Sequence, residues 1–233
     1  MQFALFNMNG LYFVLRWMHF FFGIAWIGHL YYFNFVQGAF FAETDPATRS
    51  KAIQQLVPKA LWWFRWGAMG TFLTGWIYLG MKGGETPLIF ASSWGVAILT
   101  GAVLGTLMWF NVWFVIWPAQ KQIIASAQAV AAGGQANPNA AALGAKGLLA
   151  SRHNTLFSLP LLFMMGAASH LPIQINPDRS LVPLVVVLAA IIGALELNAL
   201  KGKLGPITTV KGVIHMSFLL AIALYFIIEL MTK

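Results

Sequence analysis

The sequence contains no cysteine, and only six of its 233 residues are acidic. Within these residues, the lack of cysteine excludes disulfide bonds, thiolate metal sites and a covalently attached c-type haem, which requires a C-x-x-C-H motif. Charged residues of both signs make up 9% of the chain, whereas a soluble domain carries about 25%. Because 59% of the residues are hydrophobic, too little polar surface remains to cover a water-soluble globule. The composition predicts an integral membrane protein whose residues 1–233 form one transmembrane domain in contact with the lipid bilayer.

The formal charge of +8 does not indicate a nucleic-acid partner. The lysines and arginines do not gather on one amphipathic face, because they lie at the ends of apolar runs. The N-terminal stretch MQFALFNMNG lacks the basic region and the small-residue cleavage site of a signal peptide. We therefore expect the first apolar run to remain in the protein as a membrane anchor.

Six apolar runs are candidates for transmembrane helices, since a bilayer core of about 30 Å needs about 20 residues per helix. They cover residues 11–40, 60–81, 92–117, 153–170, 181–200 and 212–231. The first run is longer than a straight crossing requires, so we expect it to tilt or to project beyond the bilayer. The fourth run is the shortest, and Pro160 predicts a kink in it. The sequence thus predicts an all-α bundle of six transmembrane helices without an internal repeat.

Basic residues alternate between the two ends of these predicted helices. Three connections carry Arg49, Lys51, Lys59, Lys121, Lys146, Arg152, Lys201, Lys203 and Lys211, whereas the opposite ends carry Lys82, Arg179 and Lys233. The positive-inside rule then places residues 41–59, 118–152 and 201–211 in the cytoplasm and both termini in the periplasm. This orientation predicts a multi-pass protein of the bacterial inner membrane. The Ala-rich loop 118–152 contains Gly-Gly and Asn-Pro breaks, which predict two short surface helices around a turn.

Ionisable residues inside transmembrane helices are costly and are therefore candidates for function. At the predicted outer side lie Arg16 and His19 of the first helix and His170 of the fourth. A haem b needs imidazole ligands, an apolar slot and cationic or donor groups near its propionates. Arg16 shares a helix face with His19, and Gly23, one turn further, leaves room for a flat ring. These residues predict an outer-side haem b with His19 and His170 as iron ligands and Arg16 near a propionate.

A second group of ionisable residues lies toward the predicted inner side. His29, His153 and His215, with Arg65 as a counter-charge, could form a second haem site or line a substrate or proton path. We expect one haem rather than two. Glu196, on the fifth helix, is either a proton-relay acid or a carboxylate paired with Arg65 or with a histidine.

Structural interpretations compete with these assignments. A histidine near a helix end, such as His153 or His170, is commonly an interfacial hydrogen-bonding group. The side chains of Arg16 and Arg65 could extend to the membrane interfaces. Three histidines with Glu196 could also bind zinc, although the sequence contains neither H-x-x-x-H nor H-E-x-x-H.

Three longer stretches carry a resemblance to a known family. They are RWMHFFFGIAWIGHLYYFNFV at residues 16–36, NVWFVIWPAQKQIIA at 111–125 and SRHNTLFSLPLLFMMGAASHLP at 151–172. Their motifs, order and approximate spacing resemble the membrane domain of the bacterial membrane-bound urate oxidase (urate hydroxylase) family. The C-terminal third, with His215, matches less clearly.

The resemblance implies a multi-helix membrane oxidoreductase that passes electrons to a cytochrome c. Arg16 and His19 fall on the R-W-x-H motif of the family, Asn154 and Thr155 on its N-T pair, and His170 on a later histidine. The family members that gave the name carry a C-terminal cytochrome c domain. Because this chain contains no cysteine, we expect its electron acceptor to be a separate protein.

The sequence therefore predicts a b-type cytochrome in the membrane. It would carry electrons from a quinol or a small, urate-like organic donor to a periplasmic cytochrome, alone or with other membrane subunits. The main alternative is a non-catalytic accessory subunit of a respiratory or other membrane complex. A proton-coupled transporter is a third possibility, although such proteins often contain inverted repeats.

Overall fold

The computed structural model describes residues 3–233, and all regular secondary structure in that range is helical. Six long helical segments dominate it: α1–η2–α2 (Met8–Tyr31, Tyr32–Gln37, Gly38–Glu43), α4 (Val57–Glu85), α5–η4–α6 (Ser93–Phe110, Asn111–Ile116, Trp117–Ala131), α7 (Ala140–His170), α8 (Val182–Lys201) and α9 (Val210–Thr232). The short helices are η1 (Ala4–Phe6), α3 (Pro46–Gln55), η3 (Pro87–Ala91) and η5 (Gly205–Ile207). The predicted all-helical class is confirmed.

Four of the long segments have the length and apolar composition needed to cross a membrane, namely Met8–Glu43, Ser93–Ala131, Val182–Lys201 and Val210–Thr232. Large hydrophobic side chains are exposed along them, including Ile24, Phe114, Val185 and Leu230. Water would penalise such a surface, whereas lipid would not. These helices therefore suit a lipid bilayer.

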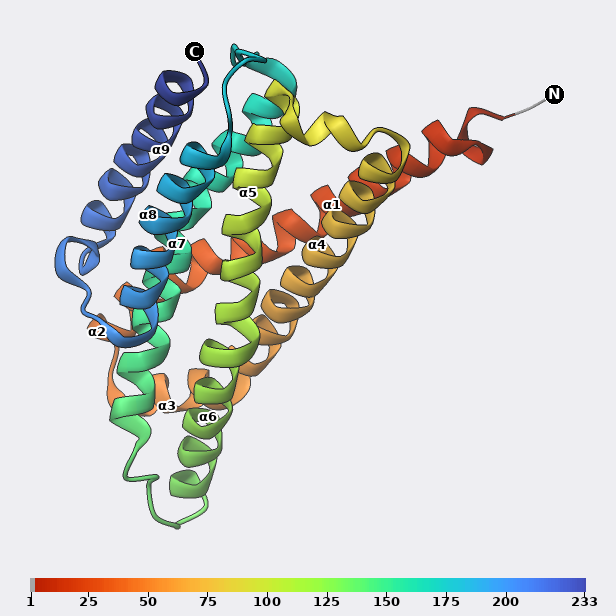
Figure 1. The fold of residues 1–233 in the computed structure, drawn as a ribbon. Helices are drawn as coiled ribbons and strands as arrows, with labels where there is room; N and C mark the ends of the chain where they lie inside the picture. The colour runs from red at the N-terminus through yellow and green to blue at the C-terminus, as the bar shows by residue number, and fades with distance from the viewer. Residues whose placement is uncertain (1–2) are drawn as a thin grey trace.

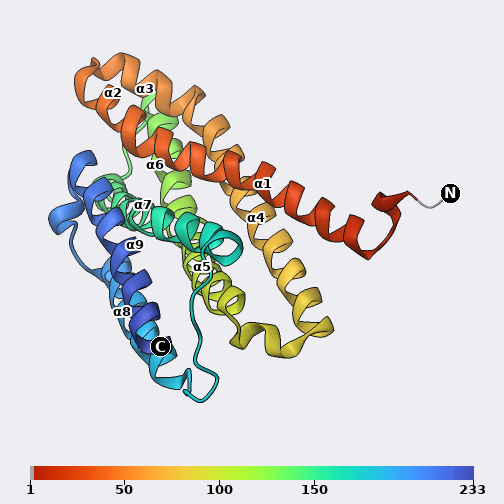
Figure 2. The same ribbon diagram turned by 90° about the horizontal axis from the view of Figure 1, so that it is seen from above.

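The arrangement of the helices is shown from two directions in Figures 1 and 2. Helix α7 packs against α5, α6, α8 and α9. Helices α1 and α4 pair along their length. The N-terminal half of α1 extends away from the helices around α7 (Figures 1 and 2). The molecule thus consists of a group of helices around α7 and a hairpin-like α1–α4 pair that diverges from this group.

The close approach of α1 and α4 depends on glycines in α4. A Cβ atom at Gly67 would lie 2.9 Å from the backbone nitrogen of Trp26, and one at Gly70 would overlap the ring of Phe22. Helices in lipid associate through such small residues because apolar burial alone provides little driving force there. Gly67, Gly70 and Gly75 of α4 therefore lie against α1, together with Thr74, which contacts His19.

The structure extends the helix of the fourth apolar run and corrects the expectation for the loop before it. Helix α7 contains 31 residues and continues through Pro160, so it begins well before residue 153. The two predicted surface helices of 118–152 are not separate elements, because α6 extends to Ala131 and α7 begins at Ala140. Alanine favours helix propagation, and Gly133, with φ of +83°, starts the turn between them.

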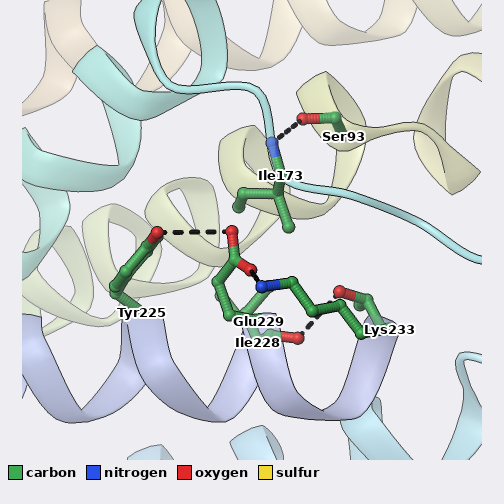
Figure 3. Close-up of polar contacts among 7 residues, drawn as sticks. Ser93, Ile173, Tyr225, Ile228, Glu229 and Lys233 are labelled. Carbon is green, nitrogen blue, oxygen red and sulfur yellow. Dashed lines mark hydrogen bonds and ion pairs between the residues drawn. The ribbon is translucent and has the colours of Figure 1, made fainter.

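The connection between α7 and α8 is held against α5 and α9, and the contact with α9 is the backbone N–H of Asn176, which donates to the Thr232 carbonyl at 2.8 Å. The backbone N–H of Ile173 donates to Ser93 Oγ at 2.7 Å (Figure 3). Nearby on α9, Glu229 accepts a hydrogen bond from Tyr225 at 3.3 Å and forms an ion pair with Lys233 at 2.7 Å (Figure 3). Glu229 thus has partners for both oxygens at the end of α9.

Candidate functional site

Polar side chains and one backbone carbonyl in residues 151–158 of α7 bond to four other long segments, and we call this stretch the α7 hub. At its centre, Asn154 Oδ1 accepts from Asn111 Nδ2 at 3.0 Å. The same Asn111 nitrogen donates to Glu196 Oε2 at 3.1 Å, and Asn154 Nδ2 donates to the carbonyl oxygen of Met108 at 2.9 Å. Asn111 and Asn154 are fully buried, and Glu196 is 7% exposed. These bonds join α5–η4, α7 and α8 in the protein interior.

His153 connects the α7 hub to α8. Its Nδ1 lies 2.9 Å from the carbonyl oxygen of Leu149, and its Nε2 lies 2.8 Å from Asn198 Nδ2. A carbonyl oxygen can only accept, so Nδ1 carries the proton and Nε2 accepts from the Asn198 amide. Both ring nitrogens are therefore used, and the structure gives His153 a helix-joining contact rather than a free ligand nitrogen.

Hydroxyl groups connect the hub to α1 and α9. Tyr31 on α1 donates to Ser158 Oγ at 2.9 Å, because that serine hydroxyl itself donates to the Thr155 carbonyl at 2.7 Å. Ser217 on α9 donates to the same Thr155 carbonyl at 3.0 Å. Thr155, which the N-T pair had singled out, thus takes part through its backbone carbonyl, which accepts both of these hydrogen bonds.

Two π-helical segments turn an asparagine toward the hub. They are YFNFVQ at Tyr32–Gln37 and NVWFVI at Asn111–Ile116. Asn34 in the first donates to Ser151 Oγ at 2.8 Å, and Asn111 in the second donates to Asn154. Because π-helical turns occur frequently at functional sites, both asparagines are candidate functional residues that the prediction from sequence missed. The local signal was a lone polar residue within an aromatic run in each case.

Glu196 has a different partner from those expected. Its Oε2 accepts from Asn111, whereas Glu196 Oε1 and Asn111 Oδ1 are buried without a hydrogen-bond partner. Among residues 3–233 the ion pairs are Lys82–Glu85 and Lys233–Glu229, so Glu196 forms none with Arg65 or with a histidine. The carboxyl group therefore belongs to the amide cluster of Asn111 and Asn154.

At the outer side, His19 of α1 contacts α4. Its Nδ1 lies 3.1 Å from Thr74 Oγ1, and the Thr74 hydroxyl donates to the Gly70 carbonyl at 2.6 Å. Since the threonine hydrogen is used in this way, Thr74 Oγ1 accepts from His19 Nδ1–H, which leaves Nε2 unprotonated. A hydrogen bond of this kind orients metal-binding histidines and fixes their tautomer. Thr74, 8% exposed, is a candidate positioning residue that the sequence did not single out.

The other outer-side residues are less enclosed. Arg16 is exposed, and its guanidinium carbon lies 5.7 Å from the centre of the Tyr78 ring. His170, the last residue of α7, is also exposed. A Cβ atom at Gly23 would meet nothing within 4 Å. Within residues 3–233 no hydrogen bond joins His19 to His170, and their joint ligation stays a prediction.

The inner-side residues do not form one cluster. His29 donates from Nδ1 to the Ala25 carbonyl at 2.7 Å, and His215 is exposed on α9. The Arg65 guanidinium stacks on Trp117, 3.9 Å from the ring centre, in a cation–π contact. In the part of the chain that the structure describes, no three His, Asp or Glu side chains are grouped so that they could hold a metal ion. The alternative of a zinc site formed by three histidines and Glu196 is therefore wrong.

The fold and the buried polar cluster define an all-helical protein suited to a bilayer, with helices joined through α7. The sequence model of the family described as "Urate oxidase N-terminal" matches residues 87–226. This match covers more than half of the chain, so the protein belongs to the Urate oxidase N-terminal family. The matched range includes the α7 hub and His170, whereas Arg16 and His19 precede it. Neither a curated protein nor a solved structure matches the chain.

Proposed function

We propose that the protein is a b-type cytochrome of the bacterial inner membrane that acts in electron transfer. Family membership supports a relationship to an oxidoreductase. The contact of His19 Nδ1 with Thr74 Oγ1, whose hydroxyl donates to the Gly70 carbonyl, is the observation that carries the proposal, because it leaves Nε2 as the unprotonated nitrogen. Neutral imidazole nitrogen is the ligand that a b-type haem iron requires.

The proposed topology has six transmembrane helices and two periplasmic termini. Each of the six long helical segments overlaps one of the six apolar runs, and the alternation of basic residues supports the proposed orientation. Helices α4 and α7 contain 29 and 31 residues, which at about 1.5 Å per residue exceeds the bilayer core of about 30 Å. The α6–α7 turn then lies in the cytoplasm, and His19 and His170 lie toward the periplasm.

The residues at the outer side supply three of the groups that a haem needs. His19 offers Nε2 from α1, His170 offers an exposed imidazole at the end of α7, and Gly23 leaves open space beside α1. Arg16, exposed three residues before His19, would neutralise a propionate. When bound, the haem would supply reversible one-electron chemistry. Thr74 would hold the His19 ring in position, and the α7 hub would hold the helix that ends at His170.

The proposed electron donor is a quinol or a small organic molecule, urate-like by family, and the proposed acceptor is a periplasmic cytochrome. The outer position of the His19–His170 site suits an acceptor on that side. A second haem that uses His29, Arg65 and His215 is the weaker form of the proposal, because His215 faces away from the bundle and His153 has no free nitrogen.

The test is an absorption spectrum of the detergent-purified protein before and after dithionite, with a pyridine haemochrome assay. We expect one b-type haem per chain, lost in His19→Ala and in His170→Ala. The exposed His215→Ala is the matched control and should retain the haem. A folded protein without haem would refute the proposal.

A non-catalytic accessory subunit is the second candidate function. The use of His153, Asn154 and Ser158 as helix-joining groups favours it, since their polarity is explained without a cofactor. A colourless protein that copurifies with other membrane subunits would support this alternative.

A further inference from the structure

Two cations share one aromatic ring where α4 meets α6. The guanidinium carbon of Arg65 on α4 lies 3.9 Å from the centre of the Trp117 ring. The ammonium nitrogen of Lys121, one turn further along α6, lies 5.5 Å from the same centre. The two charges can therefore be no further apart than the sum of these distances. An indole ring attracts each cation, but the two cations repel each other, and they do so more strongly near a bilayer than in water.

No carboxylate of the described chain neutralises this pair of cations. Both ion pairs found in residues 3–233 involve other side chains, and the head groups of Arg65 and Lys121 donate no hydrogen bond to those residues. Arg65 Nε is covered, whereas the two terminal guanidinium nitrogens remain accessible and Lys121 is exposed. The accessible nitrogens are therefore free to donate to an anion from outside the chain.

The two cations lie near one end of the proposed transmembrane helices. Lys121 is the first basic residue after the third apolar run, and Arg65 lies a short distance inside the second run. A charged residue at this depth is costly unless it is paired or extends to the interface. In the proposed orientation this interface faces the cytoplasm, so the cations lie at the level of the phosphates of the inner leaflet.

Exposed aromatic side chains adjoin the cations on the lipid-facing surface. Phe114 and Phe110, one and two turns before Trp117, are exposed and stack with 5.1 Å between ring centres. On α4, the exposed Trp62 and Trp66 flank Arg65 in the sequence. A free phosphate would gain nothing from this apolar surface, whereas the acyl chain of a lipid would cover it. The combination of charge and aromatic surface therefore favours a lipid over a soluble anion.

We propose that Arg65, Trp117 and Lys121 form a binding site for the phosphate of an anionic phospholipid from the cytoplasmic leaflet. The phosphate oxygens accept from the guanidinium and ammonium groups, and an acyl chain runs outward along Phe114 and Phe110. The bound anion removes the repulsion between the two cations. Basic sites between transmembrane helices on the cytoplasmic side bind anionic lipid head groups in other proteins. The site depends on the proposed orientation but not on the outer-side haem, so either proposal can fail without the other.

The probe is dioctanoyl phosphatidylglycerol, and dioctanoyl phosphatidylcholine is the matched control, which has the same chains and a phosphate but no net charge. Native mass spectrometry of the purified full chain in non-ionic detergent measures the fraction with bound lipid as the lipid concentration rises. We expect saturable binding of one phosphatidylglycerol, with a Kd at least about fivefold lower than that of phosphatidylcholine. This ratio corresponds to about 1 kcal/mol, the contribution of one Lys or Arg near an anionic lipid.

Three variants locate the binding. Lys121→Gln and Arg65→Gln each remove one cation and should weaken phosphatidylglycerol binding about fivefold, with little change for phosphatidylcholine. Lys121 is exposed, so its replacement should not disturb folding. The matched control is Lys211→Gln, which removes an exposed lysine from the same side of the membrane at the start of α9. This control should bind phosphatidylglycerol like the wild type.

Three outcomes would overturn the proposal. Equal affinities for phosphatidylglycerol and phosphatidylcholine would show that the charge of the lipid is not recognised. Competition by glycerol 3-phosphate, which lacks acyl chains, at concentrations similar to the lipid would indicate a site for a soluble phosphate instead. Wild-type affinity in both Arg65→Gln and Lys121→Gln, or an equal loss in Lys211→Gln, would mean that the lipid binds elsewhere or to the basic surface as a whole.

Discussion

The α7 hub and the outer half of the α1–α4 pair contain similar polar residues, but these residues use more of their hydrogen-bonding atoms in the hub. In the hub, His153 bonds through both ring nitrogens, and Asn154 bonds through both its oxygen and its nitrogen. In the α1–α4 pair, His19 bonds through Nδ1 to Thr74, and the nearby Arg16 is exposed. A polar group whose bonds are complete stabilises the fold, whereas one with a remaining lone pair can bind a ligand. The two histidines therefore have different expected roles despite similar apolar surroundings.

The largest loss of stability should follow removal of the hub amide in Asn111→Ala. Two interhelical bonds disappear, and the acceptors on Asn154 and Glu196 remain buried without that donor. Interhelical hydrogen bonds in membranes contribute about 0.6 kcal/mol on average and up to about 1.7. We expect a loss of about 2 kcal/mol in the free energy of unfolding in detergent, because both acceptors are deeply buried.

The control for this change is Thr106→Val, which removes the bond from Trp76 Nε1 to Thr106 Oγ1 between α4 and α5. That contact lies at the exposed periphery, so its loss should cost about 0.6 kcal/mol or less. Equal losses of unfolding free energy in the two variants would show that the hub bonds stabilise the fold no more than a peripheral bond does.

Thr74→Val should separate haem binding from folding. Valine preserves the shape of the side chain but cannot accept from His19 Nδ1–H, so the ring loses its fixed tautomer. Loss of such a partner typically weakens metal binding about 10–100-fold. The measurement is haem retention during titration with an apoprotein acceptor. Thr74→Ser should restore retention, and retention as in the wild type for Thr74→Val would contradict the positioning role.

Gly67→Ala should have a smaller effect on the α1–α4 pair. The added Cβ would lie 2.9 Å from the Trp26 backbone nitrogen, so the helices must move apart. Overpacking costs about 1–3 kcal/mol, and the higher helix propensity of alanine offsets about 1 kcal/mol. We expect a net loss of about 1 kcal/mol in thermal or denaturant unfolding. At Gly80, where the space is open, alanine should not destabilise the protein.

The smallest effect should come from Asp45, which lies outside both compared regions and caps α3. Its Oδ1 accepts from the backbone N–H groups of Ala47 and Thr48 at 2.9 and 3.0 Å. Hydrogen bonds from the Thr48 side chain and backbone lower the pKa of this carboxyl group below its ordinary range. A lowered pKa means that the ionised cap stabilises α3 at pH values above about 3.9, the pKa of the group in the unfolded chain. This stabilisation is lost as the pH falls through the lower pKa of the folded state.

Hydrogen exchange of α3 provides the measurement for this cap. Asp45→Ala should increase exchange in α3 at neutral pH and leave the α7 hub unchanged. Faster exchange in the hub as well would show that α3 is coupled to it.

The long helices could be predicted from the sequence because apolar length and the alternation of basic residues are local signals. The extent of α6 and α7 could not, since the Ala-rich stretch reads equally well as separate surface helices. For the site, His19 and Glu196 stood out as ionisable residues in apolar runs. Their partners Thr74 and Asn111 did not, because a threonine or asparagine inside a helix carries no periodic signal. Asn198 bonds to the second ring nitrogen of His153 because α7 packs against α8. No spacing in the sequence predicts that contact.

The two π-helical segments also decide where this chain can lose a residue. A π-helical turn takes about one residue more than an α-helical turn, so removing one residue from Asn111–Ile116 would convert the segment to α-helix and leave the direction of α6 relative to α5 nearly unchanged. The change would be local, around Asn111 and its bonds to Asn154 and Glu196. Deletion of the exposed Val103 from α5 has no such compensation, because it would rotate the two parts of the helix relative to one another by about 100°. It should therefore destabilise the protein more than deletion of Val112 does, which unfolding in detergent would measure.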